Sequence, residues 1–272
     1  MEQWVFEGLC GVAYEEAGIS MSDAKRQLVS ARVGKRIRAL KLADHEAYLK
    51  YLKADTSREE LTRFLDVITT NFTSFYREPD HFETLSEYVR SPRIVRQKSV
   101  TIWCAAAATG EEPYTLALTL KRAAPASARL RILATDLSTR ALARCREGIY
   151  EAATVNSVSP GLRKKYFKEL PDGRFQAGDE LKSLLTFGRL NLAKPPFPMQ
   201  GPLDAIFIRN VMIYFDRPVR QALISEAERM LVPGGLLFTG HAETLAGLNT
   251  RLEVVRPSVY RKPANGGSRA IH

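Results

Sequence analysis

The chain has 272 residues, of which 45% are hydrophobic, and its 40 lysines and arginines against 30 acids give a net charge of +10 at pH 7. This length suits one large α/β domain with a small accessory domain. No apolar run approaches the ~20 residues of a membrane helix, and the acidic amino terminus lacks the basic start of a secretory signal. Three cysteines without CxxC spacing are typical of reduced thiols. We therefore predict a cytoplasmic, monomeric protein whose positive charge favours an acidic partner.

Residues 1 to about 80 are rich in helix formers, and we predict an all-helical domain there. Within it, residues 24–43 carry seven basic side chains and no acid. Val29, Val33, Ile37 and Leu40 share one stripe of the predicted helix, so a narrow face packs and a broad basic face is left for solvent or a partner. Because no acid within the helix can pair at i,i+4, we favour an acidic partner over a merely solvated face.

The histidines give no sign of a metal site. His45, His81, His241 and His272 are scattered along the chain and do not form a ligand pair such as HExxH. We therefore predict that the protein holds no metal.

Residues 68–79 form a poor helix and a good binding loop. Hydroxyls, an amide and aromatic side chains lead to Arg77, directly before Glu78 and Pro79. The alternative is an aromatic hinge between domains in which Arg77 pairs with Glu78. Pro79 and the polar segment 91–99 place a domain boundary nearby, so we divide the chain into domains 1–80 and 81–262.

Residues 100–120 form the centre of the larger domain. A β-branched run, 100–103, leads into four alanines and then into an apolar segment that begins at about Gly110 to Glu112. A strand, a turn of small residues and a helix form the first unit of a doubly wound α/β sheet, which binds ligands at the carboxyl ends of its strands. Glu111 and Glu112 stand where a phosphate-binding loop would offer bare N–H groups. We therefore expect a ligand that is not a dinucleotide.

The chain then continues the sheet with one interruption. Residues 130–136 are a second strand that ends in Asp136, where nucleotide-binding sheets hold ribose hydroxyls; a helix N-cap is the alternative role. Residues 150–190 break the alternation, and we expect a small antiparallel insertion at about 160–188 that includes 184–187. The sheet resumes at 203–208, which ends in Arg209 and Asn210. After a helix at 217–231 and a strand at 236–239, residues 254–255 and 259–260 close the sheet, and 263–272 form a disordered tail.

Six segments in order carry a resemblance to a known family. They are NFTSFYRE, AAAATGEEPY, ATD, the dipeptide NL at 191–192, FIRNVMIYF and GHAET. Together they resemble the bacterial chemoreceptor glutamate methyltransferases, the CheR family, over nearly the whole chain. The resemblance implies an S-adenosylmethionine-dependent enzyme that forms γ-glutamyl methyl esters on the cytoplasmic helices of methyl-accepting chemotaxis receptors and releases S-adenosylhomocysteine.

The resemblance also assigns roles to residues. Arg77 and Tyr214 would lie next to the transferring methyl. The cofactor contacts would be Asn71, Thr73, Arg77, Glu112 (with Glu111 as second choice), Asp136, Asn191, Leu192, Arg209 and Asn210. The basic residues expected to attract acidic receptor helices are Lys25, Arg32, Lys35 and Arg36. The insertion is similar to the receptor-docking subdomain of the family but lacks its GxG loop, so tethering by a receptor peptide is not expected.

The chemistry agrees with this reading. A glutamate carboxylate has an ordinary pKa of about 4.3, so it is already a nucleophile at neutral pH and needs no general base. Two alternatives remain. A nucleic-acid methyltransferase would explain the charge, and Lys194-Pro195-Pro196-Phe197 faintly resembles the NPPF element of amino-methylating enzymes. In this chain, however, Lys replaces the Asn or Asp that accepts the target amine, and the segment precedes strand 203–208 instead of following it. We therefore predict no nucleic-acid partner. The other alternative is a non-catalytic, cofactor-bound interaction module.

Overall fold

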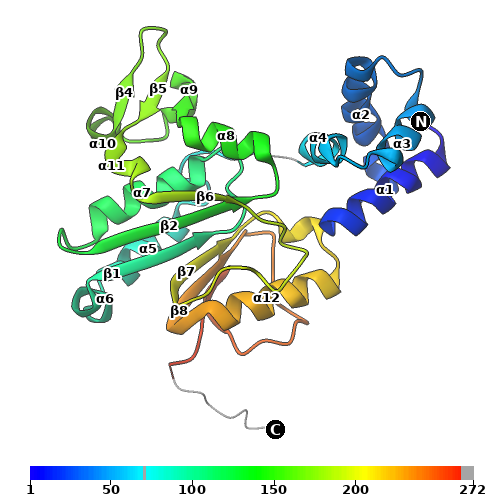
Figure 1. Cartoon of the computed structure of the whole chain (residues 1–272). Coiled ribbons are helices and arrows are strands. Elements are labelled where there is room, and N and C mark those ends of the chain that lie inside the picture. The colour runs from blue at the N-terminus through cyan, green and yellow to red at the C-terminus, as the bar shows by residue number, and fades with distance from the viewer. Residues whose placement is uncertain (70–71, 265–272) are drawn as a thin grey trace.

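The computed structural model describes residues 1–69 and 72–264. The amino-terminal residues form a helical domain beside the larger sheet domain (Figure 1). Its elements are α1 (Gln3–Ala17), the 3₁₀ turn η1 (Asp23–Lys25), α2 (Arg26–Leu40), α3 (His45–Ala54) and α4 (Glu59–Ile68). The predicted stripe of α2 is confirmed, because Val29, Val33 and Ile37 are buried and Leu40 packs against the same core cluster.

A seven-stranded sheet forms the larger domain. Its order is β6-β2-β1-β7-β8-β10-β9; the first five strands are parallel, and β10 pairs antiparallel with both β8 and β9. The strands are β1 (Ser99–Cys104), β2 (Arg129–Asp136), β6 (Leu185–Arg189), β7 (Leu203–Ile208), β8 (Leu231–Thr239), β9 (Glu253–Arg256) and β10 (Val259–Arg261). The predicted doubly wound sheet is confirmed, although β8 begins at Leu231, five residues earlier than expected.

Helices cover both faces of this sheet (Figure 1). They are α5 (Asp80–Val89), α6 (Pro92–Gln97), α7 (Glu111–Ala123), α8 (Thr139–Glu147), the 3₁₀ turn η2 (Met212–Tyr214) and α12 (Arg217–Met230). The core divides into two clusters accordingly. One contains the buried side of α5 and α7, and the other contains Trp103 of β1 and the buried side of α12. This arrangement brings the carboxyl ends of β1, β2 and β7 to one edge, which is the ligand edge of such a fold.

A small antiparallel sheet rises from the larger domain. Its order is β3-β5-β4, and its elements are β3 (Ile149–Tyr150), α9 (Ala152–Val155), α10 (Pro160–Tyr166), β4 (Phe167–Glu169), β5 (Phe175–Ala177) and α11 (Asp179–Lys182). The prediction that 184–187 belongs to this insertion is wrong. Residues 185–189 form β6, which pairs in parallel with β2, with Leu185 opposite Ile132. Leu185 and Phe187 also pack on the main core.

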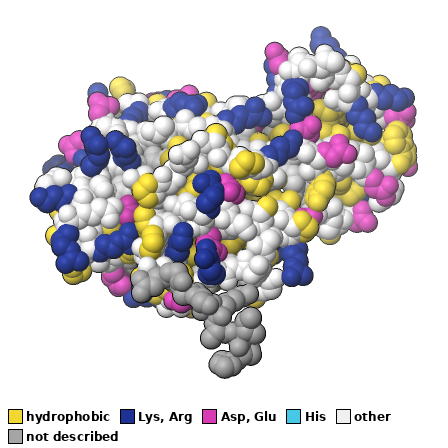
Figure 2. All heavy atoms as spheres, turned by 60° about the horizontal axis from the view of Figure 1, so that its bottom comes forward, with side chains coloured by type: hydrophobic (Ala, Val, Ile, Leu, Met, Phe, Trp, Pro, Cys, Tyr) yellow, Lys and Arg dark blue, Asp and Glu magenta, His cyan; other side chains and the backbone are white. Residues whose placement is uncertain are grey.

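None of the helices that the structure describes is long and apolar enough to cross a membrane. The predicted tail, 263–272, falls outside the described residues from 265 onward. In the view of Figure 2, lysines and arginines are spread among acidic and apolar side chains rather than gathered in one patch. On the face that Figure 2 shows, the net charge of +10 does not by itself define a binding surface.

Candidate active site

An open pocket lies at the carboxyl ends of β1, β2 and β7. Nine of the residues that we predicted to bind the cofactor or to act in catalysis line this pocket: Thr73, Arg77, Glu112, Asp136, Asn191, Leu192, Arg209, Asn210 and Tyr214. Asn71 lies outside the described residues.

The alanine turn forms the floor of the pocket. Ala105 and Ala107 donate backbone N–H bonds to the carbonyls of Phe207 and Thr135, both at 2.8 Å, which fixes the turn between β7 and β2. The turn ends at Gly110, whose φ of +103° and contact with Tyr150 leave no room for a Cβ atom. Because alanine has no side chain beyond Cβ, a flat ligand can lie directly against this backbone.

Asp136 closes the floor at the end of β2. Its Oδ2 accepts the N–H of Ala108 at 2.8 Å, and its Oδ1 accepts the N–H of Ser138 at 2.9 Å. Burial raises the pKa of Asp136 to about 6, although these backbone hydrogen bonds oppose the shift. The alternative N-cap role is wrong, since Ser138 caps α8 by accepting the N–H of Ala141. Asp136 therefore presents its carboxylate to the pocket.

Glu112 and Arg209 form a buried pair beside Asp136. Arg209 donates from NH1 to Oε2 of Glu112 at 2.7 Å, and the Cys104 thiol donates to Oε1 at 3.2 Å. Burial raises the pKa of Glu112 above its ordinary value, against the opposing charge of Arg209. Glu111 does not line the pocket; its Oε2 accepts the Thr109 hydroxyl at 2.6 Å. Of the two adjacent glutamates, only Glu112 is placed to meet a ligand.

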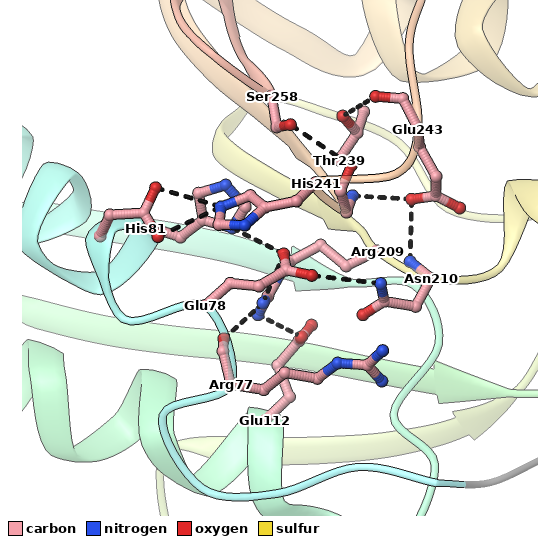
Figure 3. Close-up of polar contacts among 12 residues, drawn as sticks. Arg77, Glu78, His81, Glu112, Arg209, Asn210, Thr239, His241, Glu243 and Ser258 are labelled. Atoms are coloured by element: carbon pink, nitrogen blue, oxygen red, sulfur yellow. Dashed lines mark hydrogen bonds and ion pairs between the residues drawn. The ribbon is translucent and has the colours of Figure 1, made fainter.

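Arg77 comes from the loop before α5. It donates from NH1 to the carbonyl of Phe72 at 3.0 Å and lies over the Phe72 ring, which is 76% exposed. The alternative in which Arg77 pairs with Glu78 is wrong. Glu78 pairs with Arg209 at 3.0 Å instead, so the guanidinium of Arg77 points away from it (Figure 3). Arg77 thus brings a cation to the pocket.

Tyr214 lines the pocket from the turn η2. Within the described part of the chain, its hydroxyl makes no hydrogen bond, and the amine of Lys25 lies 4.9 Å from the ring centre. Its carbonyl accepts the N–H of Ser20 at 2.8 Å. The hydroxyl is therefore free to meet a substrate.

The segment GHAET supports the tip of β7. Glu243 accepts N–H bonds from Asn210 at 2.8 Å, Gly240 at 2.7 Å and Ile213 at 3.3 Å. Asn210 has a φ of +55°, which is uncommon for a residue with a side chain. This role of Glu243 was missed, although an acid three residues beyond the glycine that follows a strand was the available signal.

The helical domain also contributes to the pocket, and sequence reasoning missed this. Ala17 and Ile19, at the end of α1, line it. Gly18 ends α1 with a φ of +66°, and a Cβ there would lie 2.5 Å from that of Ala193. Asn191 donates its side-chain amide to the carbonyl of Glu16 at 2.6 Å. The glycine at a helix end was the available signal, but it does not say which surface the helix end meets.

The basic helix is less available than expected. Arg36 pairs with an acid of another helix, which a charge pattern within α2 does not reveal: its Nε and Nη2 lie 2.9 and 2.7 Å from the two oxygens of Glu60. Glu60 is on α4 and is 2% exposed, so the pair joins two helices rather than two turns of one. Arg32 donates to the last carbonyls of α4, including that of Ile68 at 2.7 Å. Lys35 is exposed.

Two of the histidines are not scattered in space. The ring centres of His81 and His241 lie 4.9 Å apart, next to Glu78. His81 is fully buried, and its ring nitrogens make no hydrogen bond within the described residues. Burial lowers the pKa of His81 to about 4, so it is neutral at physiological pH.

The donor set of the pocket fits S-adenosylmethionine. Asp136 offers acceptors for ribose hydroxyls at the position that nucleotide-binding sheets use, and the alanine floor leaves room for a base. Glu112 brings a second carboxylate. A pyrophosphate would need a loop rich in bare N–H groups, but the first turn of α7, which carries Glu111 and Glu112, stands in that place.

Comparisons with known proteins agree with this site. The model of the CheR methyltransferase all-alpha domain matches residues 5–69, and that of the CheR methyltransferase SAM-binding domain matches residues 71–261. The chemotaxis protein methyltransferase of Salmonella typhimurium is 37% identical, covering 94% of this chain and 88% of that protein.

Two further relatives give the same result. Chemotaxis protein methyltransferase 2 of Pseudomonas aeruginosa is 36% identical over 91% of this chain and 89% of its own length. A probable chemotaxis protein methyltransferase of Rhizobium etli is 38% identical over 86% of this chain and 90% of its own. The pocket, both domain matches and these relatives establish that the chain belongs to the CheR family of S-adenosylmethionine-dependent methyltransferases.

Proposed function

We propose that this CheR methyltransferase forms γ-methyl esters on glutamates of the cytoplasmic helices of chemoreceptors, with Arg77 and Tyr214 beside the reacting carboxylate. The observation that carries the proposal is the pocket itself. Carboxylates lie on its floor, at Asp136 and Glu112, and a guanidinium without a carboxylate partner in the described chain, that of Arg77, lies at its mouth.

The floor would hold the cofactor. Asp136 would accept hydrogen bonds from the ribose hydroxyls, and Glu112, Asn191 and the segment Arg209–Asn210 would surround the rest of the molecule. S-adenosylmethionine, when bound, would supply the methyl group on a positively charged sulfur. Thr73 and Leu192 complete this side of the pocket.

The mouth would hold the substrate. A glutamate carboxylate is ionised at neutral pH, so the protein has to orient it and exclude water rather than remove a proton. Arg77 can orient the carboxylate through its planar fork of N–H donors, and the free hydroxyl of Tyr214 can donate a further hydrogen bond. Phe72, which is 76% exposed at this rim, would cover the site once a receptor helix is in place.

The basic residues of the helical domain would attract the receptor. Lys35 is exposed, and Lys25 lies beside Tyr214 at the mouth. Arg32 and Arg36 would contribute mainly through the shape of the domain, because both are used to join α2 to α4. A partner with acidic helices fits this surface.

The nucleic-acid alternative has no support in the structure. Lys194 pairs with Glu16 at 3.3 Å, and Phe197 packs on Trp103 at 5.6 Å between ring centres. The segment that resembled an NPPF element is therefore part of the core and of a domain contact. Arg77 and Tyr214 also argue against a non-catalytic module, since they bring a guanidinium and a hydroxyl to the pocket.

The test is to incubate the full chain with methyl-labelled S-adenosylmethionine and membranes that carry methyl-accepting receptors. We expect label that mild alkali releases as methanol, which identifies a carboxyl ester. Alkali-stable label would contradict the proposal, because it would show methylation at nitrogen or carbon.

A further inference from the structure

We propose that Glu78 is a positioning residue for methyl transfer: its carboxylate, held at the tip of β7, fixes the turn that carries Arg77 and does not pair with the Arg77 guanidinium, which stays available to the substrate carboxylate. This inference rests on the function proposed above and assigns a role to a side chain outside the pocket lining.

The backbone around Arg77 is in an uncommon conformation. Tyr76 has a φ of +55° and Glu78 a φ of +58°, so Arg77 lies between two left-handed residues that are not glycine. Such a conformation is unfavourable for residues with a Cβ atom and persists only where surrounding contacts impose it. Such residues cluster at active sites and ligand clamps, and here two of them flank Arg77.

The turn is held on one side by packing. Phe75 is buried with edge-to-face contacts to Tyr150 and Phe167, at 5.0 and 5.8 Å between ring centres. The N–H of Tyr76 donates to the Thr115 hydroxyl at 3.2 Å. These contacts fix the start of the turn, up to Tyr76, against α7 and the small sheet.

On the other side, Glu78 holds the turn to β7. Its Oε2 lies 3.0 Å from NH2 of Arg209, and its Oε1 accepts the side-chain amide of Asn210 at 3.3 Å. The same NH2 of Arg209 donates to the carbonyl of Arg77 itself. Arg209 is 1% exposed and continues to Glu112, so one guanidinium joins the turn, β7 and α7 (Figure 3).

These contacts also mean that the Glu78 carboxylate neutralises Arg209 rather than Arg77. Glu78 is adjacent to Arg77 in the chain, so the two side chains could pair with each other if the backbone between them had a different conformation. Burial by itself would raise the pKa of Glu78, but the charge of Arg209 and the hydrogen bonds from Arg209 and Asn210 lower it below its ordinary value. The carboxylate is therefore ionised and already paired, and it does not compete with a substrate carboxylate for Arg77.

Three variants test this role in the full chain. Glu78→Gln keeps the shape and the bond to Asn210 but removes the negative charge that faces Arg209, while Glu78→Gly keeps the left-handed backbone and removes the side chain. Glu87→Gln is the matched control, since Glu87 lies on α5, is 60% exposed and pairs, among residues 1–69 and 72–264, only with Arg256. The readouts are kcat with receptor membranes and the affinity and stoichiometry of S-adenosylhomocysteine by calorimetry.

We expect Glu78→Gln, which keeps the bond to Asn210, to bind one S-adenosylhomocysteine per chain within about twofold of the wild-type affinity, and both Glu78 variants to lose about 10- to 100-fold in kcat, as misorientation does. The control should behave like the wild type. A kcat within about twofold of wild type for either variant would overturn the proposal. So would a loss of cofactor binding in step with kcat in Glu78→Gln, because Glu78 would then serve the folding of the pocket.

A double-variant cycle asks whether Glu78 acts through Arg77. In an Arg77→Lys background, adding Glu78→Gln should change kcat by less than about twofold, because the oriented fork is already missing. An independent, full loss in that background would show that Glu78 acts elsewhere. These outcomes are distinct from failure of the proposed function, which would show as a wild-type protein that forms no esters at all.

Discussion

The backbone N–H of Ala108 donates to Oδ2 of Asp136 at 2.8 Å, which joins the alanine turn to the end of β2. This bond holds the carboxylate at the floor of the pocket, where burial raises its pKa to about 6. The carboxylate therefore changes its charge within a range of pH that can be reached with folded protein.

Binding of S-adenosylhomocysteine should depend on pH through Asp136. The ionised form accepts hydrogen bonds from ribose hydroxyls better than the protonated form, so affinity should be constant above about pH 7. As the pH falls below about 6, affinity should fall by up to about tenfold per unit. Calorimetry between pH 5 and 8 measures this. The Asp136→Asn variant should bind more weakly with a flatter profile, and an unchanged slope in the variant would assign the titration to another group.

Replacing Arg77 should affect transfer more than cofactor binding. Arg77→Ala should lower kcat by about a hundredfold or more, because the substrate carboxylate loses its orienting partner. Arg77→Lys should also be impaired, since an ammonium lacks the planar fork of donors. Steady-state kinetics with receptor membranes, with calorimetry of S-adenosylhomocysteine as control, measures both. Turnover near that of wild type in Arg77→Ala would remove Arg77 from the mechanism.

Lys35 and Arg36 are neighbours in the chain but should respond differently to substitution. Arg36→Ala leaves the buried Glu60 unpaired and should lower the free energy of unfolding by about 3 kcal/mol. Lys35→Glu should change it by less than about 0.5 kcal/mol, yet weaken receptor engagement and its salt dependence. Denaturant unfolding and KM for receptor at two salt concentrations separate the effects. A receptor KM unchanged by Lys35→Glu would exclude Lys35 from docking.

Glu243 should matter for the tip of β7. Glu243→Ala leaves three backbone N–H groups without their acceptor, which should lower the free energy of unfolding by about 1–3 kcal/mol. Because Asn210 loses its support, affinity for S-adenosylhomocysteine should fall as well. The exposed Glu253 on β9 provides the control, Glu253→Ala. If Glu243→Ala kept the stability and the affinity of the wild type, the conformation of the segment after β7 would not depend on Glu243.

The sheet could be predicted from the sequence because its signals are local. The β-branched run before the alanine turn predicted β1, and the acid at 136 predicted the end of β2. The edge strand β6 could not be assigned in this way. Leu185 and Phe187 fit either a small sheet or the main one, and only the long-range pairing with Ile132 decides between them.

The pocket residues that belong to sequence motifs of the sheet domain could be predicted, whereas those at the contact between the two domains could not. Asp136, Glu112 and Arg209 follow strands or begin a helix, so topology alone brings them to one edge. Ala17 and Ile19 reach the same pocket from a separate domain, and nothing in their own segment indicates the partner surface. The pairing of Arg36 with Glu60 was missed for the same reason, because a charge pattern within one helix does not reveal an acid on the next.

The central claim is that the pocket on the alanine turn binds S-adenosylmethionine. A calorimetric titration of the folded full chain with S-adenosylmethionine and with its demethylated product tests this most directly. We expect one site per chain for each compound and competition between them. Folded protein that takes up neither compound would contradict the account.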